Sequence, residues 1–163
     1  MNTLELVLLF LIPCWIINIG LNIFKFLPGI QQRDKPFDFG KNFFDKQRIL
    51  GDSTTWFGLA VAIFFGVVIE SFLTNWRIGL LKGVLVFFGH ALGSFIKRRL
   101  GYSGGRFLPI IDHGDYIILT GVVFYFFGIL TMPIVIWAII VNYFVHPILC
   151  YFGFKLGLRE KML

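Results

Sequence analysis

The chain has 163 residues, of which 57% are hydrophobic and only 15% are charged, and its mean hydropathy is +0.81. Soluble domains carry about 25% charged residues, so this composition excludes a soluble globular protein and indicates an integral membrane protein. Apolar runs fill most of the length, and residues 1–163 are therefore predicted to form a single membrane domain. Cys14 and Cys150 lie within such runs, where neither a disulfide framework nor a Cys-x-x-Cys metal site is expected.

Five apolar segments are long enough to cross a bilayer core, which needs about 20 residues of helix. They cover about residues 4–24, 56–74, 78–97, 115–130 and 133–152. The first segment lacks the basic region that begins a signal peptide, so it is predicted to remain as an anchor. The expected fold is all-α, with five transmembrane helices and two longer cytoplasmic loops over residues 25–55 and 98–114.

Basic residues gather on one side of this arrangement. The first loop, the start of the second loop and the tail together hold Lys25, Arg33, Lys35, Lys41, Lys46, Arg48, Lys97, Arg98, Arg99, Arg106, Lys155, Arg159 and Lys161. The positive-inside rule makes this side cytoplasmic, with the N-terminus outside and the C-terminus inside. Lys82 is an exception that lies at the same depth as Glu70 in a helical hairpin. The two side chains are expected to form an ion pair with each other. The alternative is that these charges inside the membrane have a functional role.

Acidic residues lie on the same predicted side as the cations. The first loop holds Asp34, Asp38, Asp45 and Asp52, and Asp112 and Asp115 close the second loop. Cations bind phosphate oxygens, and carboxylates recruit Mg²⁺, which bridges to those oxygens. The mixture predicts a site for a metal-bound polyphosphate, the alternative being that Lys97, Arg98 and Arg99 only anchor a helix at the membrane surface.

Three short patterns carry this expectation. At the start of the second span, either Asp52 or Ser53 caps the helix, or the free backbone N–H groups bind phosphate. Asp112 and Asp115 face one side of a helix, where they either share a metal ion or form an acidic first turn that suits the helix dipole. On the third span one helical face carries, in order towards the surface, His90, Ser94 and Lys97.

Two stretches resemble the CDP-archaeol synthase family of membrane cytidylyltransferases, namely PFDFGK…RILGDSTTWFG at 36–58 and GHALGSFIKRRLGYSGG…LPIIDHGD at 89–115. The resemblance implies transfer of CMP from CTP to 2,3-bis-O-geranylgeranylglycerol 1-phosphate, with release of pyrophosphate and with Mg²⁺ as cofactor. CTP, the lipid phosphate and membrane lipids are the implied partners, and nucleic acid is not. Lipid chains are expected to enter from the bilayer side, beside the third span and its neighbours.

The resemblance also implies roles for individual residues. The implied phosphate clamps are Lys97, Arg98 and Arg99. The implied nucleotide-binding residues are Gly51, Asp52, Ser53, Thr54, Thr55 and Ser94. The implied metal ligands are Asp52, Asp112 and Asp115, with Asp38 as a weaker candidate.

The chain departs from the family pattern at three positions. Thr54, Phe57 and His90 stand where the family has Lys, Arg and Asp. The chain thus lacks two cations that would contact CTP and one carboxylate that would bind the metal ion. Two alternative functions remain: a cytidylyltransferase for another lipid phosphate such as diacyl phosphatidate, and a lipid-binding or transport protein without enzymatic activity.

Overall fold

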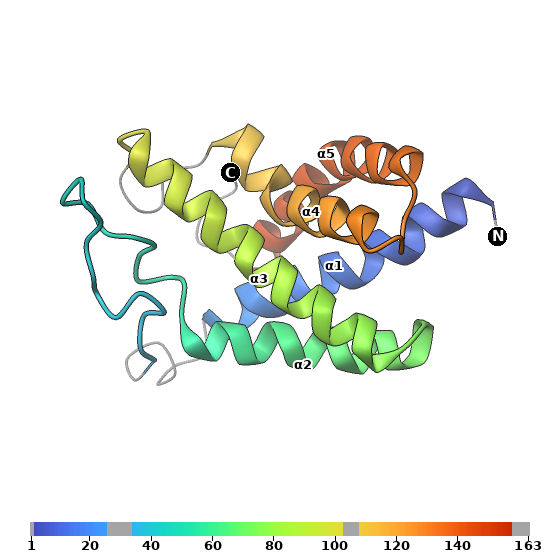
Figure 1. The fold of residues 1–163 in the computed structure, drawn as a ribbon, viewed down its shortest axis with the longest axis horizontal. Helices are drawn as coiled ribbons and strands as arrows, with labels where there is room; N and C mark the ends of the chain where they lie inside the picture. The colour runs from blue at the N-terminus through green and yellow to red at the C-terminus, as the bar shows by residue number, and fades with distance from the viewer. Residues whose placement is uncertain (1, 26–33, 103–107, 158–163) are drawn as a thin grey trace.

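The computed structural model describes residues 2–25, 34–102 and 108–157, which form five helices and no β-strand. In chain order these are α1 (Thr3–Lys25), α2 (Trp56–Leu73), α3 (Trp76–Arg99), α4 (Pro109–Phe126) and α5 (Met132–Lys155). The helices form one bundle, with residues 34–55 at one end and the N-terminus at the other (Figure 1). The predicted all-α fold is confirmed.

Four helices agree with the predicted spans to within a few residues, but α4 does not. It begins at Pro109 rather than at residue 115, because proline suits the first helical turn. Asp112 and Asp115 therefore lie inside the first turns of α4, and the prediction that they close a loop is wrong. In the part of the chain that the structure describes, α1, α2, α3 and α5 are long and apolar enough to cross a membrane.

Glycines allow α2 and α3 to pack as a close hairpin. A Cβ at Gly83 would lie 2.5 Å from the carbonyl oxygen of Ala62, so only glycine permits this approach. Near the turn, Lys82 and Glu70 form a buried ion pair, as predicted. The hydroxyl of Thr74 donates to the other oxygen of the Glu70 carboxylate, so both charges of this buried pair are compensated.

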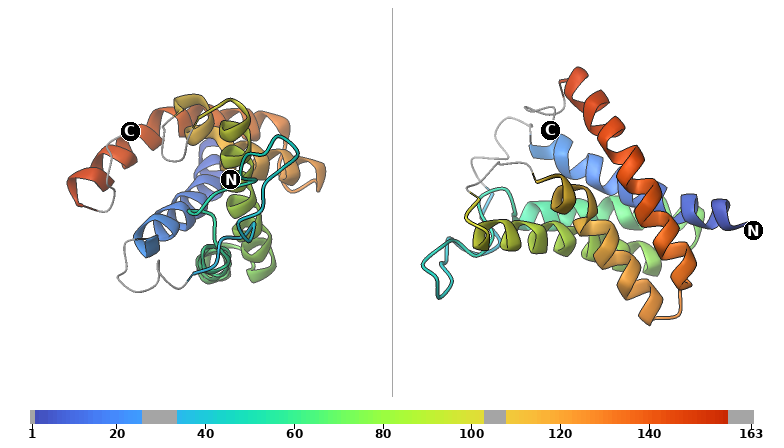
Figure 2. Two further views of the ribbon diagram at one scale, coloured as in Figure 1. Left: turned by 90° about the vertical axis from the view of Figure 1, so that its left-hand side faces the viewer. Right: turned by 90° about the horizontal axis from the view of Figure 1, so that it is seen from above.

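A buried amide ties α1, α4 and α5 together. Asn142 on α5 accepts a hydrogen bond of 2.8 Å from the indole of Trp15 on α1 and donates one of 2.5 Å to the carbonyl oxygen of His113 on α4. Figure 2 shows α5 crossing α1 obliquely at the edge of the bundle. These contacts fix the start of α4 relative to both helices.

The basic residues used to predict orientation are only partly described. Arg33, Arg106, Arg159 and Lys161 lie outside the described residues. Those that are described in the first loop lie at the end of the bundle that carries residues 34–55 (Figure 1). The C-terminal turn of α3, with its three consecutive cations, lies at the same end.

Candidate functional site

The site is built where the start of α4 packs against α3. Gly89 and Gly93 face α4, and a Cβ at either position would collide with Tyr116 or Asp115. This close approach buries the Asp115 carboxylate against α3, where its Oδ2 lies 3.3 Å from Nδ1 of His90. Its Oδ1 accepts a hydrogen bond of 2.7 Å from the backbone N–H of Tyr116. His90, on the polar face predicted for the third span, thus meets one of the two predicted carboxylates.

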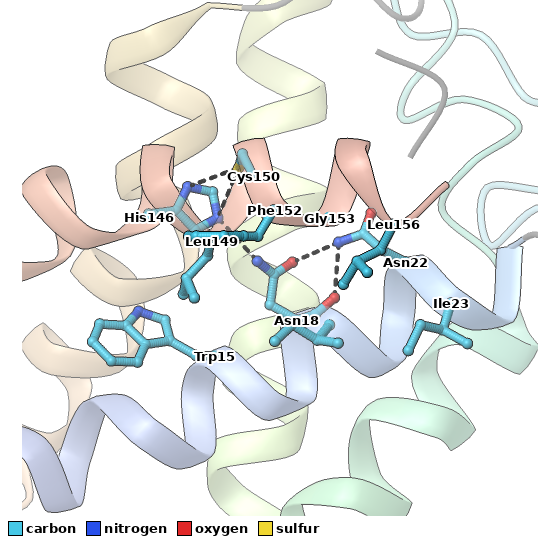
Figure 3. A pocket seen from close by; sticks show the side chains of 11 residues that line it. Trp15, Asn18, Asn22, Ile23, His146, Leu149, Cys150, Phe152, Gly153 and Leu156 are labelled. Carbon is cyan, nitrogen blue, oxygen red and sulfur yellow. Dashed lines mark hydrogen bonds between the residues drawn. The ribbon is translucent and has the colours of Figure 1, made fainter. Parts of the chain in front are cut away.

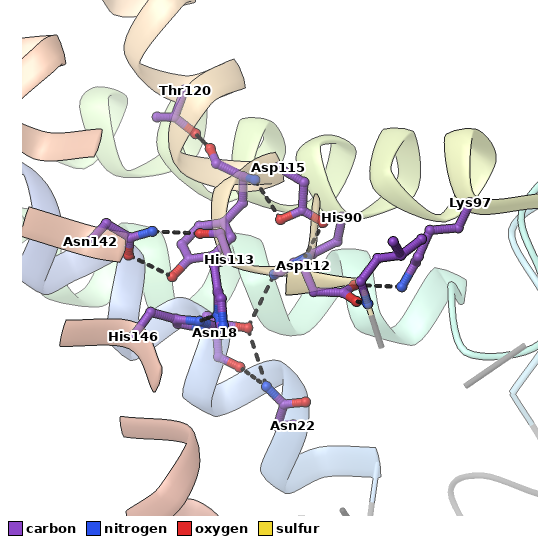
Figure 4. Close-up of polar contacts among 12 residues, drawn as sticks. Asn18, Asn22, His90, Lys97, Asp112, His113, Asp115, Thr120, Asn142 and His146 are labelled. Carbon is purple, nitrogen blue, oxygen red and sulfur yellow. Dashed lines mark hydrogen bonds and ion pairs between the residues drawn. The ribbon is translucent and has the colours of Figure 1, made fainter. Parts of the chain in front are cut away.

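Asp112 lies one turn earlier on α4 and pairs with Lys97. Its Oδ1 is 2.5 Å from the Lys97 ammonium nitrogen, and both side chains are about four-fifths buried. The other oxygen accepts a hydrogen bond of 2.7 Å from the backbone N–H of Leu108. This carboxylate therefore caps its own helix, as an acidic first turn should, and also holds a cation of α3 (Figure 4).

The two arginines that follow Lys97 hold the first loop. Arg98 donates through Nε to the carbonyl oxygen of Leu50. Arg99 donates to the carbonyl oxygens of Arg48, at 3.0 Å, and Ile49, at 3.3 Å. Its guanidinium also lies over the ring of Phe95, 4.0 Å from the centroid. Part of the hydrogen-bonding capacity of both arginines is thus used by the protein itself.

Asp38 organises the same loop from within. Its buried carboxylate accepts hydrogen bonds from Arg48 and from the backbone N–H groups of Gly40, Leu50 and Gly51. Burial acts to raise the pKa of Asp38, but these bonds outweigh it and lower the pKa to about 2. Because the folded pKa is depressed, this group stabilises the fold above the ordinary pKa of the acid, and the contribution is lost as pH falls towards 2. These contacts favour a structural role over metal binding.

The start of α2 is capped by Thr55, not by Asp52 or Ser53. Its hydroxyl accepts a hydrogen bond of 3.1 Å from the N–H of Gly58. The N–H of Phe57 donates to the carboxylate of Asp34 at 3.2 Å. Because these amides are occupied, a phosphate at this helix start would have to displace the Asp34 carboxylate.

The remaining predicted residues of this segment differ in their surroundings. Asp52 is 85% exposed and lies 3.0 Å from Arg48, and the described residues do not bring it into a ligand cluster with Asp112 and Asp115. Ser53 is exposed, Thr54 is buried and Ser94 is half-buried. Gly51 packs against the Arg98 guanidinium with a φ of 128°, a position that favours glycine. The metal role of Asp52 stays a prediction.

A buried chain of polar side chains continues from His90 into the bundle, and it was not predicted. Nε2 of His90 lies 3.1 Å from Oδ1 of Asn18, and the amide nitrogen of Asn18 lies 3.0 Å from Nε2 of His146. Nδ1 of His146 lies 2.5 Å from Nδ1 of His113. Figure 4 shows this series running from α3 through α1 to α5. Polar residues inside apolar spans are the sequence feature that could have identified it.

A mostly apolar cavity of about 260 Å³ lies between α1 and α5. Its polar lining consists mainly of Asn18, Asn22 and His146, and Trp15 and Cys150 contribute to its wall (Figure 3). Lipid chains were expected beside the third span and its neighbours, and this cavity lies beside α1, which contacts α3 through Asn18 and His90. The end of the polar chain thus borders an apolar space.

Comparison with known proteins agrees with the motifs. Residues 1–163 match the family model of CarS-like proteins, CDP-archaeol synthase. A CDP-archaeol synthase of Methanococcus aeolicus is 30% identical over 93% of this chain and 92% of its own, and one of Saccharolobus islandicus is 44% identical over 53% of this chain and 56% of its own. A solved structure of an intramembrane enzyme for archaeal membrane lipid biosynthesis has a TM-score of 0.65 and 25% identity, covering 89% of this chain and 92% of that one. The chain belongs to the CDP-archaeol synthase family.

Proposed function

We propose that this chain is a membrane cytidylyltransferase that transfers CMP from CTP to an isoprenoid ether lipid phosphate, 2,3-bis-O-geranylgeranylglycerol 1-phosphate, and releases pyrophosphate. The observation that carries the proposal is the meeting of Lys97, Asp112 and Asp115 between α3 and α4, on the residues that bear the family motif. The match of the family over the full chain supports it.

The proposal includes the orientation of the bundle. All five helices cross the membrane, and the end with residues 34–55 faces the cytoplasm, as the positive-inside rule favours. Labelling of Phe44→Cys and Thr131→Cys with a membrane-impermeant maleimide in intact cells tests this, since both positions are exposed. Position 131 should react at once and position 44 only after permeabilisation; the reverse pattern would invert the topology.

Mg²⁺ fits the carboxylates at the start of α4. Asp112 and Asp115 both turn towards α3 and offer the oxygen ligands that this ion prefers, with water to complete its shell. When bound, Mg²⁺ would offset negative charge on the phosphates of CTP. Asp52 would join these ligands only if its segment moved towards α4.

The reaction requires positioning more than covalent chemistry from the protein. A lipid phosphate oxygen attacks the α-phosphorus of CTP in line, and pyrophosphate leaves. The Lys97 ammonium, now paired with Asp112, can exchange that partner for a phosphate oxygen, which in turn releases the carboxylate to bind the metal. One ion pair thus holds both groups in place until the substrates arrive.

The cavity between α1 and α5 offers a place for an apolar chain of the lipid. Its wall is mostly apolar, and Asn18 borders both the cavity and His90. A lipid whose chain occupies this space would have its phosphate near the α3–α4 contact. The headgroup would then meet the nucleotide beside Lys97.

Lys97→Gln separates phosphate binding from membrane anchoring. A charge-assisted hydrogen bond is worth about 1.5–3 kcal/mol, so the KM for CTP or for the lipid phosphate should rise by about 10-fold or more, with membrane insertion unchanged. Steady-state kinetics of CMP transfer measures both constants. Lys155→Gln removes a cation from the last turn of α5 and serves as the control. Unchanged KM values for both substrates would mean that Lys97 only anchors α3.

His90→Asp tests the sharpest departure from the family pattern. The new carboxylate would take the place of the imidazole, whose Nδ1 now lies 3.3 Å from Oδ2 of Asp115. It should lower the Mg²⁺ concentration needed for half-maximal CMP transfer, because oxygen is a better ligand than imidazole for this ion. His90→Asn provides a neutral side chain of the same size. Identical Mg²⁺ curves for the wild type and both variants would make His90 a packing residue.

The direct experiment uses purified protein, labelled CTP and a panel of lipid phosphates. The proposal expects a CDP-lipid and pyrophosphate in equal amounts, formed fastest with the geranylgeranyl ether. Faster turnover of diacyl phosphatidate would change the substrate and keep the reaction. Lipid binding without any CDP-lipid would indicate a protein that has kept the fold and lost the activity.

A further inference from the structure

Three side chains with metal-ligating atoms gather inside the bundle, apart from the carboxylates of the proposed active site. They are His113 on α4, and His146 and Cys150 on α5, and each is about 95% buried. One ligand atom from each lies within 4.8 Å of the other two. His146 and Cys150 stand four residues apart and so face the same side of α5.

The distances resemble those of a metal site. Sγ of Cys150 lies 3.6 Å from Nδ1 of His146, and a tetrahedral zinc site holds its sulfur and nitrogen ligands about 3.6 Å apart. The Nδ1 atoms of His113 and His146 are 2.5 Å apart, whereas two nitrogen ligands of zinc are about 3.4 Å apart. A bound ion would therefore need the two rings to separate by about 1 Å.

We propose that His113, His146 and Cys150 form a buried site for a borderline-soft transition-metal ion such as Zn²⁺. Two imidazole nitrogens and a thiolate suit such an ion and do not suit Mg²⁺, which prefers oxygen. On loading, the Cys150 thiol loses its proton to solvent, and its sulfur forms a bond to the metal. The site would join α4 to α5, and its ligand on α4, His113, lies between Asp112 and Asp115 in the sequence.

Asn18 supplies a partner for the outer nitrogen of His146. A histidine that binds metal through Nδ1 carries its proton on Nε2, and that N–H needs an acceptor. The amide of Asn18 lies 3.0 Å from this nitrogen, and its oxygen faces the ring after a half turn of the side chain. The amide nitrogen of Asn18 would then donate to Nε2 of His90. The proton of the neutral His90 ring would therefore lie on Nδ1, which faces Asp115.

The cavity between α1 and α5 gives the ion a route and a further ligand position. His146 and Cys150 both line this cavity (Figure 3). Zinc with three protein ligands commonly completes its shell with water or another small ligand. The open side of the site therefore faces the space that we assign to a lipid chain.

Hydrogen bonds alone can also hold these three groups together, and a cobalt-binding experiment separates the two explanations. Full-length protein in detergent is freed of metal by a chelator and titrated with Co²⁺ in the presence of excess Mg²⁺, which occupies carboxylate sites. The proposal expects one Co²⁺ per chain, with the visible bands of tetrahedral cobalt and a near-ultraviolet thiolate-to-cobalt band. No thiolate band in the wild type would overturn it.

Variants and a second measurement test the ligands. Cys150→Ser should remove the thiolate band, and His146→Gln should weaken Co²⁺ binding at least about 10-fold. Cys14→Ser removes the other buried thiol and should leave the spectrum unchanged. X-ray absorption of the zinc-loaded wild type should show one sulfur at about 2.3 Å from the metal. This measurement uses the wild-type protein and so does not depend on the folding of any variant. A thiolate band that survives Cys150→Ser, or a zinc shell without sulfur, would refute the proposal. The proposal does not depend on cytidylyl transfer, because these measurements report metal binding alone.

Discussion

Asp115→Asn is expected to lower the rate of CMP transfer by about 100-fold or more. The amide keeps the size of the side chain and can still accept the hydrogen bond from the N–H of Tyr116, but it loses the charge that would hold the metal and offset phosphate charge. Asp112→Asn should have a similar effect, since it also leaves Lys97 without its carboxylate partner. Initial rates with labelled CTP at several Mg²⁺ concentrations measure the loss.

Glu5→Gln is a matched control for these variants. Glu5 lies in the first turn of α1, at the end of the bundle opposite residues 34–55 (Figure 1), and its loss should leave CMP transfer unchanged. If Asp112→Asn or Asp115→Asn keeps the full rate with an ordinary Mg²⁺ dependence, that carboxylate takes no part in the reaction.

Lys82→Met should destabilise the fold by about 3–5 kcal/mol, the usual cost of leaving one member of a buried ion pair without its partner. Glu70 is fully buried, and among the described residues the hydroxyl of Thr74 would then be the remaining side-chain partner of its charge. The Lys82 ammonium also lies over the rings of Phe10 and Phe124, 5.2 and 5.6 Å from their centroids. Loss of helicity during denaturant titration in detergent measures the change.

The double variant Glu70→Gln, Lys82→Met should recover much of this stability, because it removes the uncompensated charge as well. Arg77→Met is the control: this cation lies at the same turn but is exposed, and its loss should cost no more than about 0.5 kcal/mol. A single Lys82→Met variant as stable as the wild type would show that the pair does not stabilise the hairpin.

Hydropathy predicts most of this fold because the bilayer requires long apolar helices, and four of the helices meet that requirement directly. Hydropathy did not predict the start of α4, because Asp112 and Asp115 interrupt the apolar run that marks a span. The pairing of Glu70 with Lys82 was predictable because a short turn places residues at equal distances from it side by side.

The site was only partly predictable because its contacts join distant segments. The spacing of Asp112 and Asp115 indicates that both turn towards one side, but the partner of each depends on how α4 packs on α3. The contact of Arg98 with Leu50 spans 48 residues, and no local pattern reports it. The same holds for His113 and His146, whose ring nitrogens meet across 33 residues.

The contacts of Arg98 and Arg99 with residues 48–50 also determine which parts of this protein can be exchanged with those of a relative. The carbonyl oxygens of these residues accept hydrogen bonds from α3, and the ring of Phe43 lies beneath the Arg99 guanidinium, 4.8 Å from centroid to charge. The loop and the last turn of α3 therefore act as one module although they are far apart in sequence. A chimaera that transplants the loop alone would separate it from the side chains that shape it, whereas one that carries both segments transfers the whole unit.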